Sequence, residues 1–177
     1  MHYALIGMPG CGKSTVGRQL AKRLGVAFVD TDTVIEERIG GSIRSLFETQ
    51  GEAAFRDLEE QTIDDLTREG SSVIATGGGA VLRPANRQNL KSRSMVVYLR
   101  ASPEHLVRRL RHDTKRPLLQ VADPLKRLRA LYNERDALYR ETAHFIVEAR
   151  GPSVSMLVNR IIMQIEMNEG GAPTPAP

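Results

Sequence analysis

The sequence predicts an α/β fold in which a parallel sheet is covered by helices on both faces. Short apolar runs alternate with helical apolar spacing along most of the 177 residues, and such alternation is typical of parallel sheets joined by crossover helices. A glycine-rich loop stands between the first apolar run and the first helical pattern. Ligands of such sheets bind at the carboxyl ends of the strands, so we expect functional residues directly after the strands.

Short apolar runs mark five predicted strands, which follow one another at residues 3–6, 26–29, 72–75, 95–99 and 145–147. Apolar residues recur with helical spacing at residues 13–24, 52–69, 103–111, 124–141 and 152–166. One more helix is predicted to begin at Thr33, because Thr33 and Glu36 have the spacing of a capping box. The long helix over residues 52–69 carries an apolar stripe at Phe55, Leu58, Thr62 and Leu66.

The composition is that of an ordinary globular protein, with 41% hydrophobic and 26% charged residues. The length fits one domain, which we expect over residues 1–167, followed by a disordered tail at residues 168–177 that lacks apolar periodicity. The single cysteine fits a reducing compartment, and no apolar run approaches the roughly 20 residues that span a bilayer. We therefore expect a cytoplasmic protein that does not bind membranes.

Basic residues are concentrated in the second half of the chain, although the net charge is only +4. Residues 100–140 hold eleven basic and five acidic residues. Such a bias suits nucleic acid or a small anionic ligand. Because the basic residues form no continuous run and aromatic residues are only 5% of the chain, a surface that stacks single strands is poorly supported. We expect small-molecule partners and no nucleic acid.

The glycine-rich loop has the pattern of a phosphate-binding loop. Residues 7–14, Gly-Met-Pro-Gly-Cys-Gly-Lys-Ser, match G-x-x-x-x-G-K-[ST] between a strand and a helix, as that motif requires. The glycines allow backbone N–H groups to converge on phosphate oxygens, and the following helix directs its positive dipole end at the same anion. Lys13 is expected to reach the terminal phosphates and the Ser14 hydroxyl to ligate Mg²⁺. Cys11 occupies a variable position, where we expect a filler without a catalytic role.

Two acidic residues follow the second predicted strand, at the ligand edge of the sheet. Asp30 and Asp32 can hold Mg²⁺ or accept a proton from an attacking hydroxyl, and they can equally cap the following helix. The predicted capping box leaves Asp32 free for another role. The third strand ends in Thr76, so no acid stands at the usual Walker-B position, and Asp30 is expected to help with the metal.

Three consecutive glycines follow the third predicted strand at Gly77, Gly78 and Gly79. They can form a second concave surface of N–H groups, or allow a substrate to rest against bare backbone. A tight turn is the alternative, although a turn rarely needs three glycines. The position of this run favours a binding surface beside the phosphate loop.

Two arginines lie where an anionic partner is expected. Arg135 continues a stripe of leucines on the helix over residues 124–141, so it is predicted to point inward, where an unpaired charge is very unfavourable. Arg56 neighbours the apolar stripe of its own helix, where an ordinary salt bridge with Glu52, Glu59 or Glu60 is the alternative interpretation. Two arginines that converge with a carboxylate suggest a small acceptor that carries both an acid group and a hydroxyl.

These motifs, in this order, resemble the shikimate kinase family. The likeness runs from residue 4 to about residue 165 and includes six segments: residues 7–15, 30–32, 51–60, 77–81, 116–119 and 134–139. The resemblance implies a P-loop NTPase fold of the nucleoside monophosphate kinase type with five parallel strands, forming a single kinase domain. It also implies transfer of the γ-phosphoryl group of MgATP to the 3-hydroxyl of shikimate, in the biosynthesis of aromatic amino acids through chorismate.

Motifs and resemblance together assign residues to roles. Shikimate is expected to bind Asp32, Arg56, Gly77, Gly78, Gly79 and Arg135. ATP is expected to bind Gly10, Cys11, Gly12, Lys13, Ser14, Thr15, Arg109, Arg116 and Arg150, with Arg109 stacking on adenine. Mg²⁺ is expected at Ser14 and Asp30. Catalysis is expected to depend on Lys13, Asp32 and Arg116, with Arg116 in a mobile lid over residues 111–122.

Two other functions stay open at this point. One is a small kinase for another hydroxylated metabolite, such as gluconate, and the other is a nucleotide-binding switch without a small acceptor. A panel of acceptors separates the first from a shikimate kinase. Dependence of ATP turnover on an added acceptor separates the second. We expect the protein to be a monomer.

Overall fold

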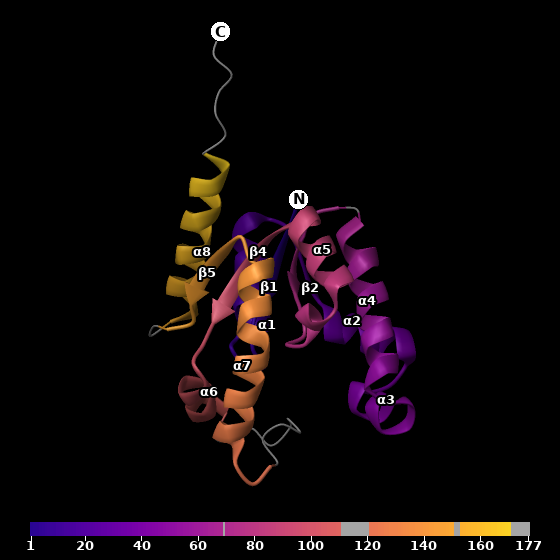
Figure 1. Ribbon diagram of the computed structural model, residues 1–177. Helices are drawn as coiled ribbons and strands as arrows, with labels where there is room; N and C mark the ends of the chain where they lie inside the picture. Colours follow the sequence, from indigo (N-terminus) through magenta and orange to yellow (C-terminus); the bar gives the residue numbers. More distant parts are fainter. Residues whose placement is uncertain (69, 111–120, 151–152, 171–177) are drawn as a thin grey trace.

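A five-stranded parallel sheet forms the centre of the molecule, as the computed structural model shows (Figure 1). The structure describes residues 1–68, 70–110, 121–150 and 153–170. The strand order is β2-β3-β1-β4-β5. The strands are β1 (His2–Ile6), β2 (Ala27–Asp30), β3 (Ser72–Ala75), β4 (Ser94–Arg100) and β5 (Phe145–Glu148). The predicted five-stranded parallel sheet with flanking helices is therefore confirmed.

Helices cover both faces of the sheet. They are α1 (Lys13–Leu24), α2 (Thr31–Ile39), α3 (Ile43–Gln50), α4 (Glu52–Arg68), the 3₁₀ turn η1 (Ala80–Leu82), α5 (Pro84–Arg93), α6 (Pro103–Leu110), α7 (Pro124–Thr142) and α8 (Val154–Glu169). In Figure 1, α1 and α8 pack together over one face, whereas α5 and α7 lie over the opposite face and α4 packs against α5. The sequence patterns predicted neither α3 nor α5.

Helix α2 begins earlier than predicted because Asp30 caps it. The Asp30 Oδ1 atom accepts hydrogen bonds from the backbone N–H groups of Asp32, at 2.9 Å, and Thr33, at 3.3 Å. The Glu36 side chain does not close a capping box, since its Oε2 atom accepts from the backbone N–H of Ile43 at 3.1 Å. The predicted capping box is therefore wrong, and Asp32 lies in the first turn of α2.

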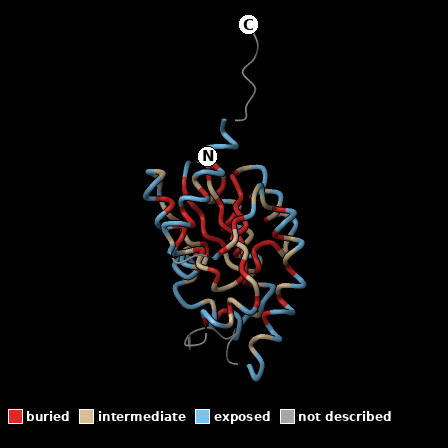
Figure 2. The backbone as a smooth tube through the Cα atoms, turned by 90° about the vertical axis from the view of Figure 1, so that its left-hand side faces the viewer, coloured by how far each residue is buried: buried red, intermediate tan, exposed pale blue. Residues whose placement is uncertain are grey.

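The central position of β1 determines where the site forms. Its residues Ala4, Leu5 and Ile6 are fully buried, and Figure 2 shows the buried residues gathered along the strands inside the molecule. In the sheet register Leu5 lies beside Ala75, and Ala75 lies beside Asp30. The carboxyl ends of β1, β3 and β2 are thus adjacent, so the loops that follow these three strands meet at one edge of the sheet.

The carboxyl-terminal helix is longer than predicted. Helix α8 runs to Glu169, so residues 168 and 169, which were expected in a disordered tail, are helical. Residues 171–177 of that expected tail lie outside the described residues. Within the described part of the chain, no helix is long and apolar enough to cross a membrane.

Candidate functional site

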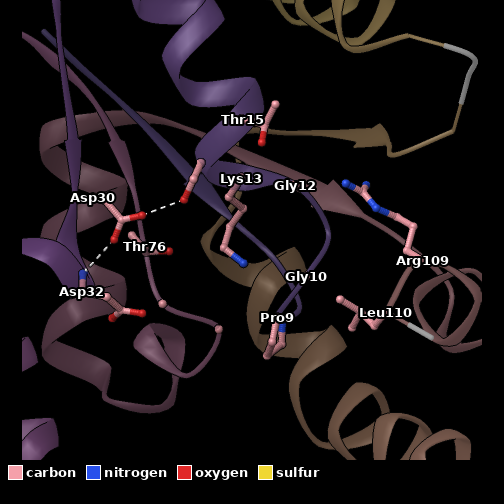
Figure 3. Close-up of a pocket in the computed structure, with 13 residues that line it drawn as sticks. Pro9, Gly10, Gly12, Lys13, Thr15, Asp30, Asp32, Thr76, Arg109 and Leu110 are labelled. Carbon is pink, nitrogen blue, oxygen red and sulfur yellow. Dashed lines mark hydrogen bonds between the residues drawn. The ribbon is translucent and has the colours of Figure 1, made fainter. Parts of the chain in front are cut away.

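A cavity of about 310 Å³ opens where the loops after β1, β2 and β3 meet (Figure 3). Its walls are formed by Pro9, Gly10, Gly12, Lys13, Ser14, Thr15, Asp30, Asp32, Thr76, Gly77, Gly78, Arg109 and Leu110. In Figure 3, Asp30 and Asp32 lie on one side of Lys13, whereas Arg109 lies on the other. The cavity brings the phosphate loop together with both predicted acids and two of the three predicted glycines. Among the expected site residues in the described part of the chain, Cys11, Arg56, Gly79, Arg135 and Arg150 do not line it.

The phosphate loop adopts a conformation that its glycines make possible. Gly10 and Gly12 have φ angles of 81° and 100°, in the left-handed region that L side chains rarely adopt. The Lys13 Nζ atom donates to the carbonyl oxygens of Gly7, at 2.8 Å, and Met8, at 2.9 Å. These bonds fix the Lys13 amine at the inner side of the loop, close to where helix α1 begins. The site therefore combines an ammonium group with a helix N-terminus, and both attract anions.

Two oxygen atoms at the cavity wall fit a magnesium ion. The Ser14 hydroxyl donates to Asp30 Oδ2 at 2.6 Å, while the other Asp30 oxygen caps α2. Mg²⁺ prefers oxygen ligands and usually keeps several waters, so one or two protein oxygens suffice. The described residues contain no group of three or more His, Cys, Asp or Glu side chains that could hold a metal by itself. This donor set therefore suits an ion that arrives with phosphate and water ligands.

The three glycines after β3 are explained by the groups that lie against them. A Cβ atom on Gly77 would lie 3.0 Å from Glu59 Oε2 and 3.1 Å from Asp32 Oδ1. A Cβ atom on Gly78 would lie 2.7 Å from Pro9 Cδ, and one on Gly79 would collide with the guanidinium of Arg56. None of the three glycines has a positive φ angle. The segment does form a turn, since the Ala80 N–H donates to the Gly77 carbonyl oxygen at 3.1 Å, but it is the close approach of these groups that favours glycine at each position.

Two carboxylates meet beside Gly77 in an environment that disfavours their charge. The Glu59 side chain is 0% exposed, and its Oε1 atom accepts a hydrogen bond from Arg56 at 2.9 Å. Burial raises the pKa of Glu59, and the charge of Arg56 opposes this shift. Burial also raises the pKa of Asp32, with a further contribution from Asp30. Asp32 Oδ1 and Glu59 Oε2 are buried atoms that lack a hydrogen-bond partner among the described residues.

Arg135 lies on the buried face of α7 as its spacing predicted, and it is 9% exposed. Its Nε atom has no hydrogen-bond partner in the described part of the chain. Its charge acts on Glu59, which places the two side chains near each other. Arg56 does form the helix salt bridges that the alternative interpretation foresaw, with Glu59 at 2.9 Å and Glu52 at 3.3 Å. Arg56 and Arg135 therefore both approach Glu59, from different helices.

Of the three arginines that were expected to bind ATP, the structure places Arg109 in the cavity wall and Arg150 outside it. Arg109 lines the cavity and donates to the carbonyl oxygen of Cys11 at 3.2 Å, so it lies directly against the phosphate loop. Arg150 is exposed, and its charge acts on His105 of α6, outside the cavity walls. Arg116 and residues 111–120 of the expected lid lie outside the described residues.

Glu59 belongs to this site but was expected only as a possible partner of Arg56. It lies four residues after Phe55 and four before Ile63, and both of these are buried. That spacing was a signal in the sequence. The predicted apolar stripe ran instead through Leu58 and Leu66, which are only partly buried, and so it left Glu59 out of the buried face.

Comparison with known proteins gives a consistent result over nearly the whole chain. A family model described as shikimate kinase matches residues 9–166. The shikimate kinase of Paracidovorax citrulli is 59% identical over 174 residues, which are 97% of this chain and 95% of that protein. The shikimate kinase of Burkholderia pseudomallei (strain 1710b) is 54% identical over 167 residues, covering 94% of this chain and 91% of that protein.

Solved structures are similar as well. A shikimate kinase from Acinetobacter baumannii in complex with shikimate has a TM-score of 0.90 and 42% identity, covering 94% of this chain and 93% of that chain. The shikimate kinase from Aquifex aeolicus has a TM-score of 0.84 and 34% identity, covering 97% of this chain and 100% of that chain. These similarities confirm the expected P-loop fold of the nucleoside monophosphate kinase type.

We expect Glu59→Gln to change how the stability of the protein depends on pH. Because the pKa of Glu59 is raised, the folded state binds a proton more readily than the unfolded state does. The resulting contribution to the free energy of unfolding is fully present below the unfolded pKa and is lost as pH rises through the folded pKa. Glutamine does not ionise, so the variant should lose less stability than the parent as pH rises from about 4.5.

Urea unfolding of the two proteins in a series of buffers from about pH 4.5 to 8 measures this difference. Glu37→Gln is the matched control, since Glu37 is exposed on α2, and it should keep the pH profile of the parent. A Glu59→Gln profile that coincides with the parent profile would show that Glu59 is not held in an unfavourable environment.

Proposed function

The chain belongs to the shikimate kinase family, and we propose that it transfers the γ-phosphoryl group of MgATP to the 3-hydroxyl of shikimate. One observation in the site carries this proposal: three buried polar atoms lack partners among the described residues around the three glycines and Arg135. Asp32 Oδ1 and Glu59 Oε2 can accept hydrogen bonds from hydroxyl groups, and Arg135 Nε can donate to a carboxylate. Shikimate carries both kinds of group, and unsatisfied buried polar atoms are unfavourable.

On the donor side, we propose that ATP lies along the phosphate loop. The backbone N–H groups of the loop and the N-terminus of α1 would hold the phosphates, and the Lys13 ammonium would stabilise charge on the transferring group. Arg109 supports a place for the adenine end, because it lies against the loop at the opposite side of the cavity from Asp32. The proposed ATP contacts are Gly10, Cys11, Gly12, Lys13, Ser14, Thr15, Arg109, Arg116 and Arg150.

Mg²⁺ would be held by the Ser14 hydroxyl and Asp30 Oδ2, together with phosphate oxygens of ATP. When bound, the ion neutralises negative charge on the β- and γ-phosphates. Asp30 keeps its place through the α2 cap. The short distance of 2.6 Å between Ser14 Oγ and Asp30 Oδ2 supports a shared role for the two oxygens.

On the acceptor side, we propose that Asp32 orients the 3-hydroxyl of shikimate toward the γ-phosphorus. The raised pKa of Asp32 supports a second role as proton acceptor, because a carboxylate with a higher pKa is a stronger base. Phosphoryl transfer has a loose transition state in most analyses, so late proton removal makes orientation the larger contribution. Arg56 and Arg135 would bind the substrate carboxylate, and residues 77–79 would form the floor beneath the ring.

We propose that Arg116 belongs to a lid over residues 111–122 that covers the phosphates and excludes water. We further propose that the enzyme acts as a monomer. A cytoplasmic location is supported by Cys11, which is free and buried. In this setting the enzyme serves the biosynthesis of aromatic amino acids.

ATP turnover should depend on shikimate. We expect ADP to form rapidly only when MgATP and shikimate are both present, as a coupled ADP assay measures. Gluconate at the same concentration is the matched acceptor control, and water alone gives the background. Equal turnover with gluconate would favour a kinase for another hydroxy acid, whereas turnover that needs no acceptor would favour a nucleotide switch.

Replacing Arg135 by leucine should weaken shikimate binding without lowering the stability of the protein. Its guanidinium lies on the buried face of α7 with an unpartnered Nε atom, so Arg135→Leu should leave the free protein as stable as the parent or about 1 kcal/mol more stable. Shikimate binding should weaken by about 2–3 kcal/mol because a charge-assisted contact is lost. ATP affinity should stay nearly unchanged.

Thermal melts and shikimate titrations test the Arg135 prediction. Arg127→Leu is the matched control, since Arg127 is exposed on the same helix. The control variant should bind shikimate like the parent. If Arg135→Leu melts far below the parent yet binds shikimate normally, Arg135 is a structural ion-pair residue and does not bind the substrate.

Gly79→Ala should weaken shikimate binding and also lower the stability of the protein, because Arg56 pairs with the buried Glu59. The φ angle of Gly79 is −94°, which alanine adopts easily, but its new Cβ atom would displace the Arg56 guanidinium. We expect the KM for shikimate to rise by about tenfold, as for a weakened charge-assisted contact. Gly41→Ala is the matched control, because a Cβ atom on Gly41 would meet nothing within 4 Å. An unchanged KM in Gly79→Ala would argue against Arg56 as a substrate ligand.

A further inference from the structure

We infer that Tyr139 is a positioning residue, whose phenol fixes the backbone of the acceptor loop, residues 77–79, through the carbonyl oxygen of Gly78. The inference rests on the proposed function, since this loop is where shikimate is proposed to bind. Tyr139 itself is not proposed to touch either substrate. It acts through the loop that it holds.

The contact between Tyr139 and Gly78 is short and part-buried, with the tyrosine on its inner side. The Tyr139 hydroxyl donates to the Gly78 carbonyl oxygen at 2.6 Å, and the tyrosine is 0% exposed. A buried hydroxyl without a partner is unfavourable, so the bond to Gly78 satisfies the phenol of Tyr139. Tyr139 follows Arg135 by four residues, and both lie on the buried face of α7. One helix face thus carries a proposed substrate ligand and the group that holds the acceptor loop.

Gly78 is confined from a second direction by the phosphate loop. A Cβ atom on Gly78 would lie 2.7 Å from Pro9 Cδ and 3.2 Å from the Pro9 nitrogen. The Gly78 peptide therefore lies between Pro9 of the phosphate loop and Tyr139 of α7. Pro9 sets how close the acceptor loop can come to the phosphate loop, and the Tyr139 hydroxyl keeps it from moving away.

The Tyr139 ring is itself held in place. Its centroid lies 4.9 Å from that of Tyr98 on β4, in a tilted arrangement. The Tyr98 hydroxyl donates to Asp136 Oδ1 at 2.8 Å, and Asp136 belongs to the same helix as Tyr139. The two rings thus tie α7 to the sheet at the level of the acceptor loop. This support holds the Tyr139 hydroxyl against Gly78, with the Arg135 side chain as its other hydrogen-bonding neighbour.

Tyr139 is suited to donating a hydrogen bond and unsuited to acid–base chemistry. Burial raises the pKa of Tyr139 above its usual range, although the charges of Arg135 and Arg56 and a hydrogen bond with the Arg135 side chain oppose this shift. The phenol therefore keeps its proton at neutral pH and acts as a permanent donor. This separates its role from that of Asp32, which faces the proposed substrate.

Loss of the Tyr139 hydroxyl should affect the acceptor more than ATP. The neighbours of Gly78 are Gly77, which packs against Asp32 and Glu59, and Gly79, which packs against Arg56. A shift of the loop would therefore disturb the shikimate contacts together. The phosphate loop keeps its own hydrogen bonds from Lys13 to Gly7 and Met8.

The experiment compares Tyr139→Phe with Tyr98→Phe. Each variant removes one phenolic hydroxyl from the same buried ring pair, but only the Tyr139 hydroxyl bonds to the acceptor loop. Steady-state kinetics measure the KM for shikimate and for ATP, and thermal melts measure stability. We expect Tyr139→Phe to raise the KM for shikimate about tenfold, as for loss of one buried hydrogen bond, with the KM for ATP within about twofold of the parent. Tyr98→Phe should leave both KM values near those of the parent while it lowers the melting temperature.

A rise in the KM for shikimate that is confined to Tyr139→Phe supports the inference, and any other pattern overturns it. Equal KM values in parent and Tyr139→Phe would show that the bond to Gly78 only stabilises the fold. An equal rise in both variants would assign the effect to the ring pair. Partial unfolding of a variant leaves the comparison intact, because KM does not depend on how much of the enzyme is active. A parent that does not phosphorylate shikimate would instead overturn the proposed function.

Discussion

The burial of charged side chains beside the acceptor loop is the constraint on which the rest of the site depends. Glu59 is fully buried and its pKa is raised, so its charge is tolerated only because Arg56 pairs with it. That pair needs space next to the backbone after β3, and residues 77–79 provide it by having no side chains. Arg135 approaches the same carboxylate from α7 with a spare donor. The site is therefore polar and crowded, and some of its buried polar atoms lack hydrogen-bond partners among the described residues. A small polar acid could supply those partners.

Strand order brings this acceptor region next to the phosphate loop. Because β1 pairs with β3, the loops after these strands are neighbours, and the Thr76 hydroxyl donates to the Leu5 carbonyl oxygen at 2.9 Å at the point where they diverge. Beyond that bond, Pro9 packs on Gly78. The proposed donor and acceptor sites are thus adjacent as a direct result of the sheet topology. The hydrogen bond from Tyr139 of α7 to Gly78 then holds the loop after β3 in its place beside the phosphate loop.

Local signals predicted the phosphate loop and α1, since the glycines, the lysine and the apolar spacing are all contained in one short segment. Helix α5 was not predicted because only two of its residues, Asn86 and Leu90, are buried. Two buried residues do not produce a periodic apolar pattern. The burial of Glu59 could not be predicted from local sequence in this way. A carboxylate on a buried helix face is stable only through contacts with residues distant in sequence. The three glycines were predicted to matter, but the groups that require them come from α2, α4 and the phosphate loop.

Asp30 shows why a choice between a structural and a functional role can be mistaken. The sequence allowed Asp30 either to cap the next helix or to help bind a metal. In the structure its two oxygens have different partners: Oδ1 accepts from the N–H groups that begin α2, and Oδ2 accepts from the Ser14 hydroxyl at the start of α1. A magnesium ion bound between Ser14 and Oδ2 would leave the cap intact. The cap in turn fixes the first turn of α2, which carries Asp32. One carboxylate thus contacts Ser14, a proposed metal ligand, and also positions the group that would orient the acceptor.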